Sequence, residues 1–249
     1  MKFMGGGQTK IMGIVNVNGD SFYEASRSAG CEAFCRRVDY LLERGASIID
    51  IGAVSSRPGA VAVSAAEEWE RLAPVLREAA RRYSGVAFSL DTFRSDIVLR
   101  AYELMGTFIV NDISAGAWDE QMLPLVGRLG LRYIAMHLQG TFATMHAAWF
   151  YDDVVSSVIE YFESFSRRAA ACGIEDWILD PGFGFSKSAA DNMRLLEALP
   201  RLKVFGRPIL VGISHKRFTA GFRPLAATGL SELETLAAAR GADILRSHL

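Results

Sequence analysis

Cysteine, net charge and long apolar segments are all scarce in this sequence of 249 residues. The cysteines, Cys31, Cys35 and Cys172, are odd in number, so we expect reduced structural residues rather than a disulfide framework. Cys31 and Cys35 have a spacing that could share a metal, but further ligands are lacking nearby. Lys and Arg total 27 against 28 for Asp and Glu, which argues against nucleic-acid partners and general attraction to anionic membranes.

The apolar segments have the length of strands and fall short of the roughly 18 residues that a membrane span needs. Residues 1–10 have no apolar core like that of a signal peptide, so we expect a cytoplasmic protein. The hydrophobic content is 50%, enough for one large core in a chain of this length. We therefore expect a single domain over residues 1–249.

Strand-like and helix-like segments alternate along the whole chain. The expected strands are 11–16, 47–52, 86–91, 108–112, 132–137, 177–180, 208–214 and 242–246. The expected helices are 31–44, 64–83, 95–105, 119–129, one from about 149 to 172, and 189–199. Eight units at roughly 30-residue intervals predict a (β/α)8 TIM barrel. A doubly wound open sheet also satisfies the alternation, although no Gly-x-Gly-x-x-Gly follows the first strand.

The stretch Trp177–Lys187 joins a short apolar run to a carboxylate, Asp180, and then to a Pro/Gly turn with two aromatic residues. A buried strand that ends in a carboxylate and opens into a glycine-rich loop is how an α/β enzyme presents chemistry at the carboxyl edge of its sheet. The alternative is an ordinary strand-to-helix turn, because Asp-Pro-Gly is also common in turns.

Polar residues stand at or just beyond the carboxyl ends of the other expected strands as well. They are Asn16, Asp91, Asn111 or Asp112, His137, Ser214, Lys216, Arg246 and His248. Any single one could be a strand-end cap, but the whole set implies one common mouth.

Three groups of side chains follow from this rim. Asp91, Asp180, Asn111 and Lys216 suit a flat heterocycle rich in N–H donors. Asn16, Ser56, Arg57, Arg246 and His248 could hold a phosphate or pyrophosphate. Phe22, Pro58 and Phe185 could form an apolar slot between them, or simply pack their loops.

Several motifs, in order along the chain, resemble the dihydropteroate synthases of folate biosynthesis, a pterin-binding family. They lie at 14–22, 50–59, 89–92, 110–113, 136–141, 178–185 and 211–216, and the most specific are Ser-Ser-Arg-Pro-Gly at 55–59 and the segment around Asp180. The resemblance implies a (β/α)8 barrel, usually a homodimer, that joins 6-hydroxymethyl-7,8-dihydropterin pyrophosphate to p-aminobenzoate with Mg²⁺.

The resemblance also assigns roles to residues. The pterin would be bound by Asp91, Asn111, Asp180 and Lys216. Mg²⁺ and pyrophosphate would contact Asn16, and the anion site would be completed by Ser56, Arg57, Arg246 and His248. The p-aminobenzoate slot would be formed by Phe22, Pro58, Phe185 and Ser214. Asp91, Asp180, Lys216 and Arg246 are the expected catalytic residues.

Two departures from the family pattern favour an alternative, a catalytically weakened relative that binds pterin as a binding or structural subunit. Asn18-Gly19 replaces the usual Thr-Pro of the first loop, and His215 replaces the usual arginine of a Ser-Arg-Lys triplet. The sequence also stops at Leu249, where a barrel normally adds a covering helix, so we expect a covering partner or a shortened sequence. A further alternative is another pterin-binding barrel, such as a folate-dependent methyltransferase domain.

Overall fold

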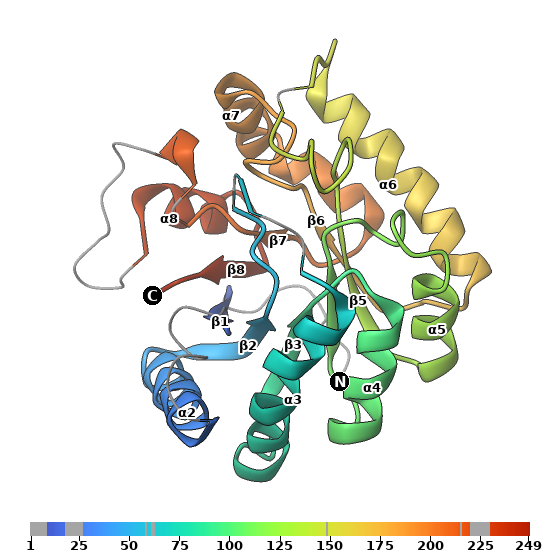
Figure 1. The fold of residues 1–249 in the computed structure, drawn as a ribbon. Coiled ribbons are helices and arrows are strands. Elements are labelled where there is room, and N and C mark those ends of the chain that lie inside the picture. The colour runs from blue at the N-terminus through green and yellow to red at the C-terminus, as the bar shows by residue number, and fades with distance from the viewer. Residues whose placement is uncertain are drawn as a thin grey trace.

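Eight parallel strands pair side by side around the centre of the fold (Figure 1). The computed structural model describes residues 9–17, 27–57, 59–60, 63–147, 149–214, 216–219 and 230–249. The strands are β1 (Lys10–Asn16), β2 (Ala46–Gly52), β3 (Ala87–Asp91), β4 (Ile109–Asp112), β5 (Arg132–Met136), β6 (Trp177–Asp180), β7 (Leu210–Val211) and β8 (Ile244–Ser247).

The sheet closes on itself. The hydrogen-bonded order is β6-β5-β4-β3-β2-β1-β8-β7, and a parallel bridge between Leu179 and Ile209 joins the two outer strands. The N–H of Leu179 donates to the carbonyl of Pro208 at 2.9 Å across this seam. The expected (β/α)8 barrel is therefore confirmed, and the doubly wound open sheet is excluded.

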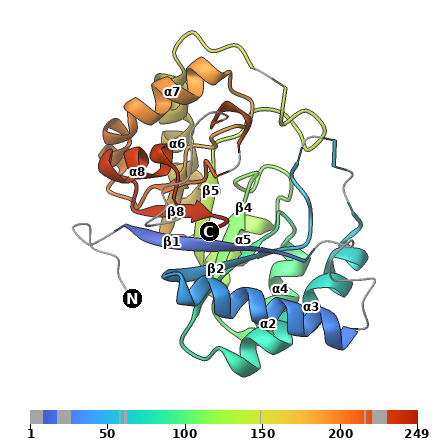
Figure 2. The same cartoon turned by 90° about the vertical axis from the view of Figure 1, so that its left-hand side faces the viewer.

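Helices surround the strands on the outside (Figures 1 and 2). They are α2 (Arg27–Glu43), α3 (Ala65–Arg82), α4 (Ser95–Met105), α5 (Met122–Leu129), α6 (Val154–Ala171), α7 (Ala189–Glu197) and α8 (Glu232–Ala239), with 3₁₀ helices η1 (Leu199–Phe205) and η2 (Arg217–Thr219). Serine caps begin α3, α7 and α8, each in a capping box.

Two expectations about secondary structure were wrong. The seventh strand was expected over 208–214 but pairs in regular strand form only at Leu210–Val211, because the chain turns away after Gly212 into the loop that carries Ser214. Helix α8 was not expected at all. Its amphipathic signal is weak, since Leu-Ala-Ala-Ala offers little contrast between two faces.

An apolar layer fills the lower interior of the barrel. Its members come from seven of the strands and contact one another: Met12, Ile48, Ile109, Ile134, Ile178, Leu210 and Ile244. Because side chains alternate between the two faces of a strand, the residues two positions further along also point inward. On four of these strands those residues are Asp50, Asn111, Asp180 and Arg246. A polar layer therefore lies directly above the apolar floor.

The larger core lies between the barrel and its helices. Around β6, Trp177 packs against Phe162 and Phe165 of α6, with ring centroids 6.1 and 5.0 Å away. All three rings are buried, so they hold the strand that ends at Asp180 against the outer layer. In the part of the chain that the structure describes, no helix combines the length and apolar character needed to cross a membrane.

We expect Phe162→Ala to lower the free energy of unfolding by about 3–5 kcal/mol, because it leaves a cavity beside Trp177. Phe150→Ala is the matched control, because Phe150 is 84% exposed and its loss should change stability by less than about 0.5 kcal/mol. Urea denaturation of both variants measures the difference. Equal losses for the two variants would contradict the assignment of Phe162 to the core.

Candidate active site

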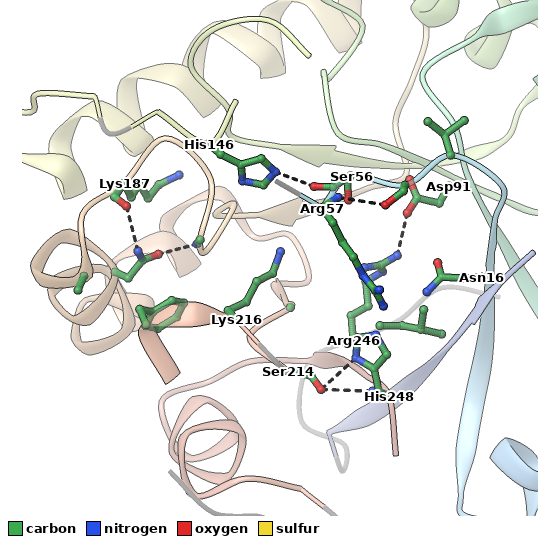
Figure 3. A pocket seen from close by; sticks show the side chains of 18 residues that line it. Asn16, Ser56, Arg57, Asp91, His146, Lys187, Ser214, Lys216, Arg246 and His248 are labelled. Atoms are coloured by element: carbon green, nitrogen blue, oxygen red, sulfur yellow. Dashed lines mark hydrogen bonds and ion pairs between the residues drawn. The ribbon is translucent and has the colours of Figure 1, made fainter. Parts of the chain in front are cut away.

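A cavity of about 530 Å³ lies at the carboxyl ends of the strands (Figure 3). Of the residues expected at the site, those that line it are Asn16, Ser56, Arg57, Asp91, Ser214, Lys216, Arg246 and His248. Asn111, Asp180 and Phe185 do not line it and are buried around it. Phe22, Pro58, Asn18-Gly19 and His215 lie outside the described residues. Residues far apart in the sequence therefore meet at one mouth, as the pattern of strand ends predicts.

Arg246 links two carboxylates at the base of this cavity. Its Nε donates to Oδ2 of Asp50 at 2.7 Å, and its Nη2 donates to Oδ2 of Asp91 at 2.8 Å. The expected pterin group and the expected anion group are thus one network, because Arg246 was assigned to the second and Asp91 to the first. A guanidinium suits this role, since its planar donors can engage two acceptors at once.

Asp50 is a residue of the site for which the sequence suggested no separate role. It is fully buried, and it accepts hydrogen bonds from Nδ2 of Asn111 at 3.2 and 3.3 Å as well as from Arg246. Its signal in the sequence is a carboxylate inside the apolar run Ile48-Ile-Asp-Ile51, where a buried charge needs partners. Asp50 therefore orients an amide from β4 and a guanidinium from β8.

Asp180 is held by the loop that follows it. Its Oδ1 accepts the N–H of Gly182 at 2.8 Å, and Gly182 has φ 71° with its Cα packed against the carbonyl of His137. A Cβ there would lie 2.0 Å from that carbonyl oxygen, so only glycine fits. Gly182 is therefore required for the conformation of this turn, and its N–H holds the Asp180 carboxylate in place.

Lys187 closes the same loop from within. Its buried Nζ donates to the carbonyls of Gly182 at 2.9 Å and Phe185 at 3.1 Å, and more weakly to that of His137 at 3.4 Å. Burial lowers the pKa of Lys187 to about 7. These contacts give the lysine that ends the Trp177–Lys187 stretch a structural role, which is to hold the loop carbonyls together.

Burial also shifts the pKa values of ionisable groups in and around the cavity. It raises the pKa of Asp180 to about 6 and that of Asp91 to about 7, although the nearby cations oppose both shifts. It lowers the pKa of Lys216 to about 8, and the positive charge of Arg246 adds to this effect. Such perturbed groups in a cavity are typical of functional sites.

An aromatic wall stands beside Lys216. Its Nζ lies 4.0 Å from the ring centroid of Phe185, a cation–π contact. The ring of His146, from the loop after β5, stacks on Phe185 with centroids 5.3 Å apart. Although Phe185 itself is buried, its neighbours Lys216 and His146 both line the cavity.

The segments that follow β7 and β8 are joined at the rim of the cavity. Oγ of Ser214 lies 3.2 Å from Nδ1 of His248 and accepts the backbone N–H of His248 at 3.4 Å. Arg37 of α2 donates to the carbonyl of His248 and, at 3.5 Å, to that of Ile14. These bonds position the last residues of β8 beside the end of β1.

Two other residues of the expected rim have structural roles. Asp112 is buried and accepts hydrogen bonds from Ser114, Gly116 and the hydroxyl of Tyr133, so it stabilises the turn after β4. His137 is buried, its ring packs on Tyr161 at 4.9 Å, and burial holds its pKa well below the usual range. Asn111, not Asp112, is therefore the β4 residue that faces the network.

The donor set at the mouth suits a magnesium ion that is held chiefly by its substrate. The described residues contain no group of three or more His, Cys, Asp or Glu side chains that could hold a metal. Mg²⁺ keeps several waters and is commonly bound through one or two protein oxygens together with substrate phosphates. The amide oxygen of Asn16, which lines the cavity, is a ligand of that kind.

Comparisons with known proteins agree on one family. A family model described as pterin binding enzyme matches residues 12–248. The dihydropteroate synthase of Neisseria meningitidis serogroup C is 39% identical over 249 residues, which cover 96% of this chain and 87% of the relative.

Solved structures of the Xanthomonas albilineans dihydropteroate synthase are also similar. The complex with 4-aminobenzoic acid is 38% identical with a TM-score of 0.84, and covers 97% of this chain and 88% of that chain. The complex with 7,8-dihydropteroate is 35% identical with a TM-score of 0.81, over the same shares of the two chains.

We expect Asp50→Asn to lower the free energy of unfolding by about 1–3 kcal/mol, because it removes the charge that Arg246 and Asn111 share. Asp176→Asn is the matched control. Asp176 pairs with Arg132, but its side chain is 56% exposed, so its loss should cost less than about 1 kcal/mol. Urea denaturation compares them, and a larger loss for Asp176→Asn would contradict the central place of Asp50.

Proposed function

The chain belongs to the pterin-binding enzyme family, and from this membership we propose the reaction that it catalyses. It joins 6-hydroxymethyl-7,8-dihydropterin pyrophosphate to p-aminobenzoate and releases 7,8-dihydropteroate and pyrophosphate, as a dihydropteroate synthase. One observation carries the proposal: a layer of carboxylates, amide and guanidinium lies on an apolar floor directly below a cavity with further cations. The relatives are transferases of this kind along nearly the whole chain.

The polar layer is suited to the pterin ring. We assign ring binding to Asp91, Asn111, Asp180 and Lys216. Asp180 uses one oxygen to accept the N–H of Gly182, which leaves the other to accept hydrogen bonds from ring N–H groups. Because Asp180 is buried and Asp91 is only partly exposed, these bonds form where competing water is scarce.

The mouth of the cavity is suited to the pyrophosphate. Three strand ends, those of β1, β2 and β8, supply Asn16, Ser56, Arg57, Arg246 and His248, which line one cavity, so their donors converge on one region. Arginine binds phosphate oxygens in bidentate geometry. A magnesium ion bound by Asn16 and the substrate phosphates would neutralise part of the charge on the leaving group.

The chemistry needs little proton transfer from the protein. The bond between the pterin methylene carbon and the pyrophosphate oxygen breaks, the arylamine nitrogen forms a bond to the same carbon, and that nitrogen then loses a proton to solvent. Negative charge grows on the leaving pyrophosphate, where Arg57 and Arg246 would stabilise it. Positive charge grows on the methylene, where the ionised carboxylates Asp91 and Asp180 would stabilise it.

The arylamine slot is assigned to Phe185 and Ser214, with Phe22 and Pro58 outside the described residues. Phe185 contacts the cavity-lining residues Lys216 and His146, and Ser214 lines the cavity directly. Lys216 lies between the two proposed substrates, because it faces the cavity and contacts Phe185 at the same time.

We further propose that the protein is cytoplasmic and that it forms a homodimer. Light scattering on the purified protein would test the homodimer.

Purified protein with dihydropterin pyrophosphate, p-aminobenzoate and Mg²⁺ should release pyrophosphate only when both substrates are present. The same assay without p-aminobenzoate is the control, because the arylamine supplies the attacking nitrogen. Tight pterin binding without pyrophosphate release would overturn the proposal. That outcome would instead indicate a binding subunit, the alternative suggested by Asn18-Gly19 and His215.

Pterin affinity should fall as the pH drops below about 6. Burial raises the pKa of Asp180 to about 6, and only its ionised form has both oxygens available as acceptors, one for the Gly182 N–H and the other for a ring N–H. Below that pH the affinity should decline by about tenfold per unit, because one proton must be released for each pterin bound. Calorimetric titration between pH 5 and 8 measures this, with Asp180→Asn as the control that should bind weakly and keep only the pH dependence that Asp91 contributes near pH 7. A wild-type affinity that stays constant over the range would contradict the role of Asp180.

A further inference from the structure

His146 connects the loop after β5 to the loop after β2 across the rim of the cavity (Figure 3). Its Nε2 lies 2.7 Å from the backbone carbonyl of Ser56. A carbonyl oxygen only accepts hydrogen bonds, so Nε2 carries the hydrogen and donates it. Neither the resemblance to a family nor the pattern of strand ends pointed to this residue, because it lies well beyond the end of β5.

The same ring contacts a third loop. It stacks on Phe185 with a centroid distance of 5.3 Å and an interplanar angle of 25°. Phe185 belongs to the loop after β6 and in turn contacts Nζ of Lys216, which follows β7. The imidazole of His146 lines the cavity and connects the loop after β5 to the loops after β2 and β6. Through Phe185 it is also connected to the segment after β7.

The loop that carries His146 is anchored firmly enough to hold it in place. Ser186 joins it to the loop after β6: its N–H donates to Met145 at 2.9 Å, and its carbonyl accepts the N–H of Trp149 at 3.2 Å. Met145 is buried in a small apolar cluster that also contains Phe185 and Met136. Two anchors on either side of His146 thus fix the backbone from which its ring extends.

The consequence falls on Ser56 and Arg57. A hydrogen bond to the Ser56 carbonyl restrains the peptide unit that joins these two residues, and the N–H of Arg57 donates to Oγ of Ser55 at 3.3 Å. Holding a segment in its binding geometry before the ligand arrives reduces the entropy lost on binding. His146 therefore restrains Ser56 and Arg57, which are assigned to the pyrophosphate site, and also the aromatic wall formed by Phe185.

We propose that His146 is a positioning residue for substrate binding: it holds the Ser55–Arg57 segment and the Phe185 wall in register with each other. This inference rests on the proposed function of the cavity. His146 contacts Ser56 on the rim and Phe185 in the wall, so we expect it to act on pyrophosphate and p-aminobenzoate and to leave pterin binding unchanged.

Steady-state kinetics on three variants test the proposal. His146→Phe keeps a stacking ring but loses the N–H donor, so the KM for p-aminobenzoate should rise about tenfold, the value of one hydrogen bond. His146→Gln restores an amide donor at a similar reach and should recover most of that loss. Phe150→Ala changes an exposed residue on the same loop and should match the wild type. Pterin affinity should stay within about twofold for all three, because the polar layer is untouched.

Amide hydrogen exchange of the unliganded protein tests the restraint without catalysis. Exchange in the peptide that contains Ser55–Arg57 should quicken in His146→Phe and remain near the wild-type rate in His146→Gln. If the wild type shows no turnover but exchange follows this pattern, the proposed function fails and the positioning role stands. Unchanged exchange in His146→Phe, or an equal loss of pterin and p-aminobenzoate affinity, would overturn the positioning role.

Discussion

The half-buried guanidinium of Arg246, which binds both Asp50 and Asp91, is the interaction on which the site depends. Two carboxylates this close inside a barrel would repel each other strongly, and the arginine makes their burial tolerable. The charge also draws together strands that are not neighbours, because β8 meets β2 and β3, and Asp50 reaches on to Asn111 of β4. The polar layer is therefore a connected network whose members orient one another before any ligand binds.

Loops built on this layer use backbone groups rather than further charges. Lys187 gathers the carbonyls of the loop after Asp180, Gly182 allows that loop to approach His137, and His146 restrains the carbonyl of Ser56. Each contact satisfies a polar group that would otherwise be left open near the cavity. The departures from the family pattern, Asn18-Gly19 and His215, lie outside the described residues.

Some features could be predicted because they follow from local periodicity. The alternation of strands and helices and the placement of Asp91 and Asp180 at strand ends derive from spacing along the chain, whereas the choice between Asn111 and Asp112 at the rim did not. The features of the site that the sequence did not predict depend on contacts between segments that are far apart along the chain. Asp50 looks like an interruption of an apolar strand until Arg246, nearly two hundred residues later, is placed beside it. His146 looks like any polar loop residue until Ser56 and Phe185 surround it.

The sequence by itself determined the eight alternating units and the polar residues at the strand ends, because short apolar runs and helical segments at roughly 30-residue intervals favour parallel βα units. The choice between a closed barrel and an open sheet came from the tertiary structure, through the bridge between Leu179 and Ile209. The tertiary structure alone decided which of those polar residues share a cavity and which serve the fold. Asp112 and His137 end their strands as Asp91 and Asp180 do, yet they are taken up by a turn and by aromatic packing. Closure of the barrel sets these partners, and no local pattern encodes the distance between strands that meet only when the sheet has closed.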